Sequence, residues 1–505
     1  MTTADNGRFL RYWWEVSAAQ INRLAKTEAD AKRSPARWYP YQKGGEAVKW
    51  FGNNDWVVDW RNDGADVKGN VDPKTLRVRS HNYNGQYSFR EGITWSSFSN
   101  GGLTFRHVPS GSLFDSTGSM AFAPSNIFGY LALLNTTSAF RFLKAYSPSA
   151  RIKIESLLAI PDILEHRDAA ELEGLARECV GAAMELCRYD ESTPGFAISR
   201  SQDLAVLSGL SVRIQELREC IATNEVRMEK MLSQGFGFPE MATPVPGVNG
   251  CEFGGRELLS YAIGCMMGRY SLDEPGLIYA HAGNVGFEPG RYATFPADAD
   301  GIVPTTDELW FADDACSRIR EFLRAVWGPD TLEENMAWLA ESLGKKSAKE
   351  ASETPDETIR RYIADKFFKD HLQTYKKRPI YWLFSSGKQG AFQALVYLHR
   401  YHEGTLARLR AEYVVPLTGK IQSRIEMLQK DAAAASSTAA RNKLAKEVEK
   451  LKKKHVELLA YDEQLRHYAD MRITLDLDDG VKVNYGKFGD LLEGVKLVTG
   501  GAVDD

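Results

Sequence analysis

The sequence predicts an α+β protein, in which a mixed, β-rich domain precedes a mostly α-helical C-terminal region with a helical hairpin. Two observations predict this order. Residues 36–115 alternate aromatic and β-branched runs with Asn, Asp and Gly clusters, which is typical of strands and turns. From residue 306 onward, apolar residues recur mainly at helical spacing. The length of 505 residues is enough for about three domains.

The β-rich part is expected to contain several short strands, at residues 56–60, 76–79, 87–89 and 103–108. A helix should follow, with Ser125 as its N-cap, an apolar face that includes Phe128 and Leu131, and an end by Pro148. Residues 151–161 are predicted to form a return strand. These elements would complete a first domain of residues 1–165.

The rest of the chain is predicted to form two further domains. Residues 166–304 mix helices with loops and are acidic, and residues 305–505 are mostly helical. A helical hairpin is expected at 418–470, because its second arm carries a coiled-coil spacing of Leu444, Val448, Leu451, His455 and Leu458. This hairpin is either an internal brace or a surface for a partner. Residues 473–488 are expected to form a short β-hairpin.

Charge is unevenly distributed along the chain. The net charge is only −4, which argues against a protein that is basic throughout. However, residues 1–110 hold 16 Lys and Arg against 11 Asp and Glu, and residues 361–410 hold 10 against 3. A polyanion such as nucleic acid would bind these two basic segments. The alternative is that both basic segments are ordinary solvated surfaces, whose positive charge is balanced in the folded protein by the acidic middle of the chain.

Several classes of protein are excluded or disfavoured. No stretch approaches 18 uncharged apolar residues, so no transmembrane helix is predicted. The first residues lack the pattern of a signal peptide. The six cysteines contain no CxxC pair and no metal-like spacing with the nine histidines, so we expect a reduced, cytoplasmic chain without a metal site.

The motifs of a methyltransferase active site are also absent. S-adenosylmethionine binding needs a Gly-rich strand-to-helix turn, and an amino-methyltransferase needs an NPPY-type loop; the sequence has neither. Ser386, Gly387 and Lys388 look like the end of a phosphate-binding loop, but Gln389 replaces the Ser or Thr that binds magnesium. No catalytic or cofactor-binding residue is therefore predicted, and the chain does not look like a complete enzyme.

The first basic segment interleaves cations with aromatic residues, as in Arg37-Trp38-Tyr39. Lys and Arg neutralise phosphates, Asn and Arg pair with base edges, and aromatic rings stack on displaced bases. The other interpretation is a Trp-rich core beneath ordinary surface lysines.

A resemblance favours DNA recognition. The segment GITWSSFSNGGLTFRHVPSGSLFDSTGS, at residues 92–119, resembles the specificity-domain signature of type IIG restriction–modification enzymes and related adenine methyltransferases. Further matches include RWYPYQKGGEAVKWFGNNDWVVDW and FFKDHLQTYKKRPIYWLFSSGKQGAFQALVYLHRY. Together they resemble the PglX family, the adenine-specific DNA methyltransferases of type 1 BREX phage-defence systems, over essentially the whole chain.

The resemblance implies that this chain corresponds to a C-terminal portion, because members of the family are more than twice as long. Residues 1–165 would be the target-recognition domain. They would bind double-stranded DNA and present the target adenine to a methyltransferase half, which would hold S-adenosylmethionine and the flipped base. The rival hypothesis is a non-catalytic assembly module that docks other BREX proteins.

We expect twelve residues to face DNA. Thr94 and Ser96 should share one face of a strand, with Trp95 on the opposite face. Lys376, Lys377 and Arg378 should clamp phosphates in the second basic segment. The full set is Lys43, Lys49, Asn53, Asn54, Arg90, Thr94, Ser96, Arg106, His107, Lys376, Lys377 and Arg378.

Overall fold

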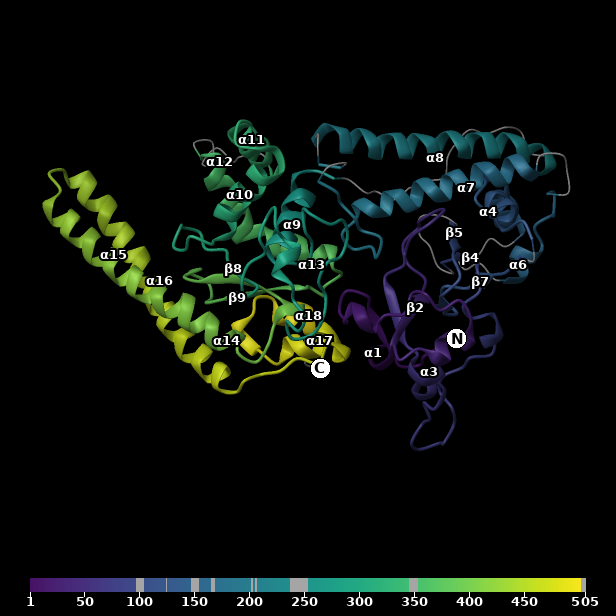
Figure 1. Cartoon of the computed structure of the whole chain (residues 1–505), viewed down its shortest axis with the longest axis horizontal. Helices are drawn as coiled ribbons and strands as arrows, with labels where there is room; N and C mark the ends of the chain where they lie inside the picture. Colours follow the sequence, from purple (N-terminus) through teal and green to yellow (C-terminus); the bar gives the residue numbers. More distant parts are fainter. Residues whose placement is uncertain are drawn as a thin grey trace. The chain divides into compact units, whose positions relative to one another are not determined.

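A computed structural model of the chain describes residues 1–96, 104–123, 125–146, 154–164, 169–200, 203–204, 207–236, 253–344 and 353–500. It divides into two compact units (Figure 1). Unit 1 is Met1–Ile198 with Val206–Phe253, and unit 2 is Ser199–Ala205 with Gly254–Asp505. The expected middle domain, residues 166–304, is shared between these units. Both units combine helices with small sheets, so the predicted α+β class is confirmed.

Unit 1 contains two small sheets. The first has the order β1 (Leu10–Tyr12), β3 (Trp56–Asp59), β2 (Trp38–Gln42) and β6 (Leu113–Phe114); only the β2–β6 pair is parallel. The second has the order β5 (Phe105–Val108), β4 (Gly92–Trp95) and β7 (Met120–Ala121), and it is antiparallel.

Two of the four expected strands differ from the prediction. Residues 76–79 provide only a single bridge, between Val78 and Val71. Residues 85–87 form a 3-10 turn, and Phe89 has a φ of 67°, outside the extended region. The tryptophans of this unit mostly form its core, since Trp14, Trp38, Trp50, Trp60 and Trp95 are each at most 2% exposed. These five rings are therefore packing residues and not a stacking platform.

Helices cover the sheets of unit 1. They are α1 (Asn6–Phe9), α2 (Glu28–Arg33), α3 (Arg61–Lys68), α4 (Ile127–Leu134), α5 (Thr137–Tyr146), α6 (Ile154–Leu158), α7 (Ala169–Leu186) and α8 (Leu207–Phe236), with 3-10 turns at Ala18–Gln20, Gly85–Tyr87 and Cys187–Tyr189. Helix α7 packs against both α4 and α8.

The single helix expected after Ser125 is wrong, because the structure has two helices, and the N-cap of the first is Asn126. The break has a local cause. The Asn135 side chain bonds the backbone of Phe105 in both directions, at 3.0 Å each, and the Thr136 hydroxyl accepts from Ala139 N and starts the second helix. The predicted end at Pro148 lies outside the described residues.

The return strand predicted at residues 151–161 is also wrong. Residues Ile154–Leu158 form a short helix, α6, and residues 151–153 lie outside the described part of the chain. A helical turn satisfies its backbone groups locally, whereas a strand needs a neighbour to pair with. Of the strands that the structure describes in unit 1, each is paired with another element, and none pairs with this segment.

Unit 2 surrounds a small antiparallel sheet with the order β8 (Ile302–Pro304), β10 (Gln393–Tyr397) and β9 (Tyr381–Ser385). Its helices are α9 (Gly255–Met266), α10 (Ala315–Trp327), α11 (Leu332–Ser342), α12 (Pro355–Tyr362), α13 (Phe368–Thr374), α14 (Thr405–Arg408), α15 (Val415–Ala434), α16 (Thr438–Asp470), α17 (Gly480–Gly486) and α18 (Val495–Thr499). Two π-helical segments, Ile363–Phe367 and Leu409–Val414, adjoin α12 and α14, and 3-10 turns lie at Pro289–Arg291, Leu398–Arg400, Leu477–Asp479 and Gly489–Leu491.

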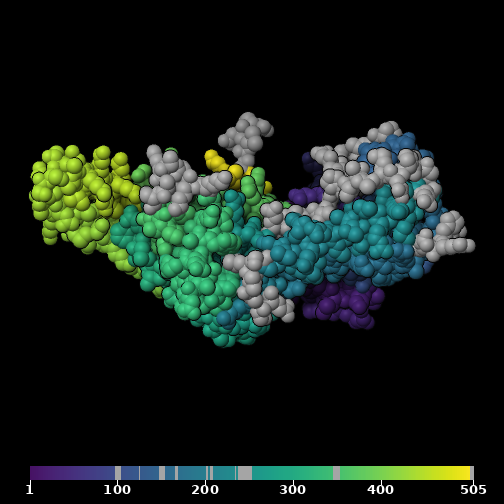
Figure 2. Space-filling model, turned by 90° about the horizontal axis from the view of Figure 1, so that it is seen from above, coloured from purple at the N-terminus to yellow at the C-terminus, as the bar shows by residue number. Residues whose placement is uncertain are grey.

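The predicted helical hairpin is confirmed as α15 and α16, whose far part forms the yellow-green lobe in Figure 2. Of the predicted seam, Val448, Leu451 and Leu458 are buried, whereas Leu444 and His455 are only half-buried. Lys454 is also buried, and its ammonium group pairs with Asp307 at 2.5 Å. The β-hairpin expected at 473–488 is wrong, since this segment holds a 3-10 turn at Leu477–Asp479 and helix α17.

No helix among the described residues combines the length and apolar character needed to cross a membrane.

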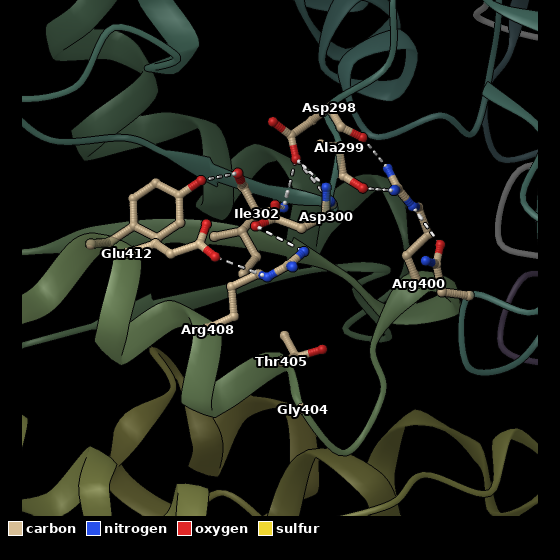
Figure 3. A network of polar contacts seen from close by, with 12 residues as sticks. Asp298, Ala299, Asp300, Ile302, Arg400, Gly404, Thr405, Arg408 and Glu412 are labelled. Carbon is tan, nitrogen blue, oxygen red and sulfur yellow. Dashed lines mark hydrogen bonds and ion pairs between the residues drawn. The ribbon is translucent and has the colours of Figure 1, made fainter. Parts of the chain in front are cut away.

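A polar network fixes the loop that enters β8 (Figure 3). Arg400 is 1% exposed, and its guanidinium group donates to the carbonyl oxygens of Asp298 at 2.6 Å and Ala299 at 2.8 Å. The Asp298 carboxylate accepts from the backbone nitrogens of Asp300 and Gly301. Burial, together with the neighbouring Asp298 carboxylate, raises the pKa of Asp300 to about 8, although Arg408 acts in the opposite direction.

This raised pKa gives a pH prediction for unit 2. In the folded state Asp300 keeps its proton up to about pH 8, whereas in the unfolded chain it loses the proton near pH 3.9. Asp300 therefore contributes stability that is full at low pH and is lost as the pH rises through this window. We expect Asp300→Asn to flatten the dependence of melting temperature on pH between about 5 and 8. Thermal unfolding at a series of pH values measures this, and an unchanged pH profile would contradict it.

Candidate nucleic-acid interface

Loops that follow or precede the strands of unit 1 meet at one place. We call residues 43–46, 53–55, 96 and 115–119 the loop cluster. Gly45 N donates to Ser96 Oγ at 3.1 Å, and Asn53 Nδ2 donates to the Glu46 carbonyl oxygen at 2.9 Å. Asn54 Oδ1 accepts from Gln42 at the end of β2, at 3.0 Å. The fold therefore brings Lys43, Asn53 and Asn54 close to Ser96, which lies more than 40 positions further along the chain.

Two glycines allow these loops to touch. A Cβ atom on Gly44 would lie 2.8 Å from the Thr117 carbonyl oxygen, and one on Gly118 would lie 2.8 Å from the Gln42 carbonyl oxygen. Such distances are shorter than a carbon–oxygen contact, so a larger residue at either position would push the loops apart. The close approach between residues 43–46 and 115–119 thus depends on glycine at both positions.

Lys43 is the cation of the loop cluster. Its ammonium group lies 4.9 Å from the centre of the half-buried Trp56 ring. Burial lowers the pKa of Lys43, and the negative charge of Asp115 partly offsets this effect. The Asp115 carboxylate is itself bonded by Ser116 and Thr117. Lys43 is half-buried, with its position set by the ring.

Five of the expected DNA-facing side chains lie inside unit 1 and are at most 9% exposed: Lys49, Thr94, Ser96, Arg106 and His107. Thr94 donates its hydroxyl to the Ser119 carbonyl oxygen at 3.0 Å. Trp95 is buried as expected, but Thr94 and Ser96, which were expected to face DNA, are buried as well, so both faces of this strand are covered.

Lys49 and Arg106 are buried cations beside the β5 edge. Lys49 Nζ pairs with Glu225 Oε1 of α8 at 3.0 Å, and Trp50 Nε1 donates to the same oxygen at 2.8 Å. Arg106 is 0% exposed and donates to the Val48 carbonyl oxygen at 3.4 Å, while its Nε and Nη2 have no hydrogen-bond partner among the described residues. Burial lowers the pKa of Arg106 to about 10. These cations hold residues 48–50 in place.

Arg90 and His107 lie at the other end of β4. Arg90 is exposed over the Tyr87 ring, at 5.3 Å from its centre. His107 pairs with Ile93 across the sheet, and its Nε2 lies 2.7 Å from Glu91 Oε1. Arg90 and His107 therefore lie near the start of β4, whereas the loop-cluster residue Ser96 follows its end.

The expected phosphate clamp belongs to unit 2. Lys376 and Lys377 follow α13 and are exposed, with left-handed φ values of 50° and 60°. Arg378 is half-buried and donates to the Val498 carbonyl oxygen at 3.2 Å. Two of the three cations thus point to the surface of unit 2, and the third also ties the chain to α18.

The segment that resembles a phosphate-binding loop is a turn between β9 and β10. The Glu457 carboxylate of α16 accepts from Gln389 N at 2.6 Å, from Ala391 N at 3.1 Å and from Ser386 Oγ at 2.8 Å. The donors that would hold a phosphate are therefore occupied by the protein's own carboxylate. Within the described ranges, no group of three His, Cys, Asp or Glu side chains is arranged to hold a metal.

Two acidic residues of α8, Glu225 and Glu229, support this region without any local signal in the sequence. Glu225 neutralises Lys49, and Glu229 accepts from Thr137 N at 2.6 Å and Ser138 N at 3.1 Å at the start of α5. Glu229 lies 92 positions from Thr137 and Glu225 lies 176 positions from Lys49, so no local pattern could have connected them.

Comparison with known proteins confirms the resemblance. The chain is 40% identical over 530 aligned residues to the adenine-specific methyltransferase BrxX of Escherichia coli O9:H4 (strain HS), covering 98% of this chain and 42% of that protein. It is 36% identical over 510 residues to the adenine-specific methyltransferase PglX of Lacticaseibacillus casei (strain Zhang), covering 96% and 41%. No protein-family model matches. The chain thus spans about two-fifths of the length of the curated relatives it matches.

Proposed function

We propose that this chain, which is homologous along nearly its whole length to part of the adenine-specific methyltransferases BrxX and PglX, is the target-recognition part of such an enzyme. In this proposal, unit 1 binds duplex DNA and presents an adenine to a methyltransferase half outside this chain. That half would hold S-adenosylmethionine, and the assembled enzyme would act in a BREX anti-phage system with other BREX proteins.

The loop cluster is the observation that carries the proposal. It holds a cation, Lys43, and two amide side chains, Asn53 and Asn54, on loops at the ends of strands that hydrogen bonds tie together. Cations bind phosphates and position a duplex, whereas amides bind adenine through its N6 and N7 atoms. Loops that a rigid sheet holds in place are the usual location of such contacts.

The buried members of the predicted set have a supporting role in this proposal. Lys49 and Arg106 fix residues 48–50, and Thr94 and Ser96 fix the loops at 115–119 and 43–46. Direct contact with DNA is assigned to Lys43, Asn53, Asn54 and Arg90, and phosphate contact in unit 2 to the exposed Lys376 and Lys377.

Binding of the whole chain to duplex DNA tests the function. Selection from a random duplex pool at about 50 and 200 mM salt should enrich one short motif. Lys43→Ala should weaken binding to all duplexes and reduce the slope of log affinity against log salt by about 0.9. Asn53→Ala should cost about 1–3 kcal/mol at one base position only.

Lys32→Ala serves as the control, because Lys32 is an exposed cation on α2 that pairs with Glu28. This variant should leave the salt slope nearly unchanged. If the chain binds no duplex at either salt concentration, the target-recognition function is wrong, and the docking of other BREX proteins becomes the better hypothesis. Equal salt slopes for Lys43→Ala and Lys32→Ala would remove Lys43 from the interface.

A further inference from the structure

A short exposed finger follows α3 in unit 1. We define the finger as residues 70–81; it is the loop that extends beyond α3 in Figure 1. Val71 and Val78 pair across it, Arg79 N donates to the Asn70 carbonyl oxygen at 2.8 Å, and Asp72 N donates to the Arg77 carbonyl oxygen at 2.9 Å. The finger is thus a narrow antiparallel hairpin with a tight turn at its tip.

Hydrogen bonds make the tip rigid. The Asp72 carboxylate accepts from Lys74 N at 2.9 Å and Thr75 N at 2.8 Å, and it pairs with the Arg79 guanidinium group. These donors hold the pKa of Asp72 well below its usual range. Leu76 N closes the turn with a 2.8 Å bond to the Asp72 carbonyl oxygen. The tip therefore has a defined conformation before any ligand binds.

This rigid tip presents a leucine to solvent. Leu76 is 78% exposed and has a φ of 55°, a left-handed conformation that is strained for a side chain of this size. Val78 behind it is 52% exposed. The strained backbone at Leu76, held by a rigid turn, is the observation that points to a functional contact, because strained conformations are concentrated at ligand-binding and other functional sites.

The charges around Leu76 favour a polyanionic ligand. Lys74, Arg77 and Arg79 are the cations of the finger, against one acid, Asp72, which Arg79 already pairs with. Lys74 and Arg77 lie on either side of Leu76 in the sequence and are exposed. An apolar tip between two cations is complementary to a duplex, in which phosphate rows flank a groove of stacked bases.

The finger is also joined to the loop cluster through the first residues of the chain. Thr2 and His81 exchange backbone hydrogen bonds at 2.8 and 3.1 Å, and Ser80 Oγ donates to the Thr3 carbonyl oxygen at 2.7 Å. Met1 N donates to the carbonyl oxygen of Phe114, which precedes the loop cluster residue Asp115. Residues 1–3 are thus bonded both to the base of the finger and to the end of β6, which leads into the loop cluster.

We propose that the finger is a DNA wedge: Leu76 enters a groove of the duplex and inserts between two base pairs, while Lys74 and Arg77 bind the phosphates on either side. This inference rests on the proposed function, because it requires that unit 1 binds DNA. It extends that function, because an inserted side chain deforms the duplex. Since flexible base steps deform most easily, such a step would be part of the recognised sequence.

The test uses the whole chain and duplexes that carry 2-aminopurine at successive positions, since this base fluoresces more strongly when it is unstacked. The wild-type chain should raise the fluorescence at one step. Leu76→Ser should abolish this rise and weaken binding about tenfold. Lys74→Ala and Arg77→Ala should each reduce the salt slope by about 0.9. Leu24→Ser is the matched control, because Leu24 is 87% exposed in the same unit.

The outcomes separate the two proposals. If the wild-type chain binds duplex but unstacks no base, the wedge is wrong and target recognition stands. The same holds if Leu76→Ser equals Leu24→Ser in affinity and fluorescence. If the wild-type chain binds no duplex, both proposals fail. Equal melting temperatures of Leu76→Ser and wild type establish that the variant folds.

Discussion

Replacement of Glu225 by leucine is expected to destabilise unit 1 by about 3–5 kcal/mol. Lys49 and Glu225 pair at 3.0 Å, with side chains that are only 2% and 7% exposed. Removal of the carboxylate would leave the Lys49 ammonium group buried without its counter-charge, and Trp50 Nε1 would lose its acceptor. The contact between α8 and residues 49–50 would then open. Urea unfolding measures the loss, and hydrogen exchange assigns it to unit 1.

Two further variants make this prediction specific. Glu216→Leu, on the same helix, removes an exposed pair with Arg213 and should cost less than about 1 kcal/mol. The double variant Lys49→Met/Glu225→Leu replaces both charges with apolar groups and should recover much of the lost stability. If Lys49→Met instead leaves stability unchanged and reduces the salt slope of DNA binding, Lys49 is a phosphate contact and not a structural cation.

The largest effect in unit 2 is expected for Arg400→Met, which should lower stability by about 3–5 kcal/mol. The Arg400 guanidinium group donates to the carbonyl oxygens of Asp298 and Ala299 and to Asn284 Oδ1, and it lies 3.8 Å from the centre of the Phe287 ring. Methionine fills the space of the side-chain stem but donates no hydrogen bond. Buried acceptors would then lack their donor, which is the costly case.

Arg408→Met is the control for this variant. Arg408 belongs to the same network, but it is 44% exposed and lies 3.8 Å from Asp300. Its loss should cost less than about 1 kcal/mol, because Asp300 keeps its proton at neutral pH and the remaining pair of Arg408, with Glu412 at 3.2 Å, is exposed and contributes little. Thermal and urea unfolding compare the two variants directly. Equal losses for Arg400→Met and Arg408→Met would show that burial does not decide the energy of this network.

Local patterns in the sequence were sufficient for several elements. The apolar spacing of Val448, Leu451 and Leu458 predicted the α15–α16 hairpin, because one face of a helix repeats every three to four residues. The strands β3 and β5 follow from runs of aromatic and β-branched residues. The return strand at 151–161 and the tail hairpin failed, since short apolar segments fit a strand or a helical turn equally well and only their neighbours decide.

For the candidate site, too, some features could be predicted from the sequence and others depend on the tertiary structure. The α+β class and the relatedness to adenine-specific methyltransferases follow from the sequence alone. For the proposed DNA contact, the sequence supplies only candidate residue types, cations and amides. Which of those residues reach the surface was decided only by the tertiary structure. Lys43 and Lys49 lie in similar sequence contexts, but Lys49 is buried because it pairs with Glu225, 176 positions further along the chain. Among the described residues, Lys43 has no such partner in the core and remains half-buried against Trp56. A buried charge needs a partner, and that partner comes from wherever the fold places it.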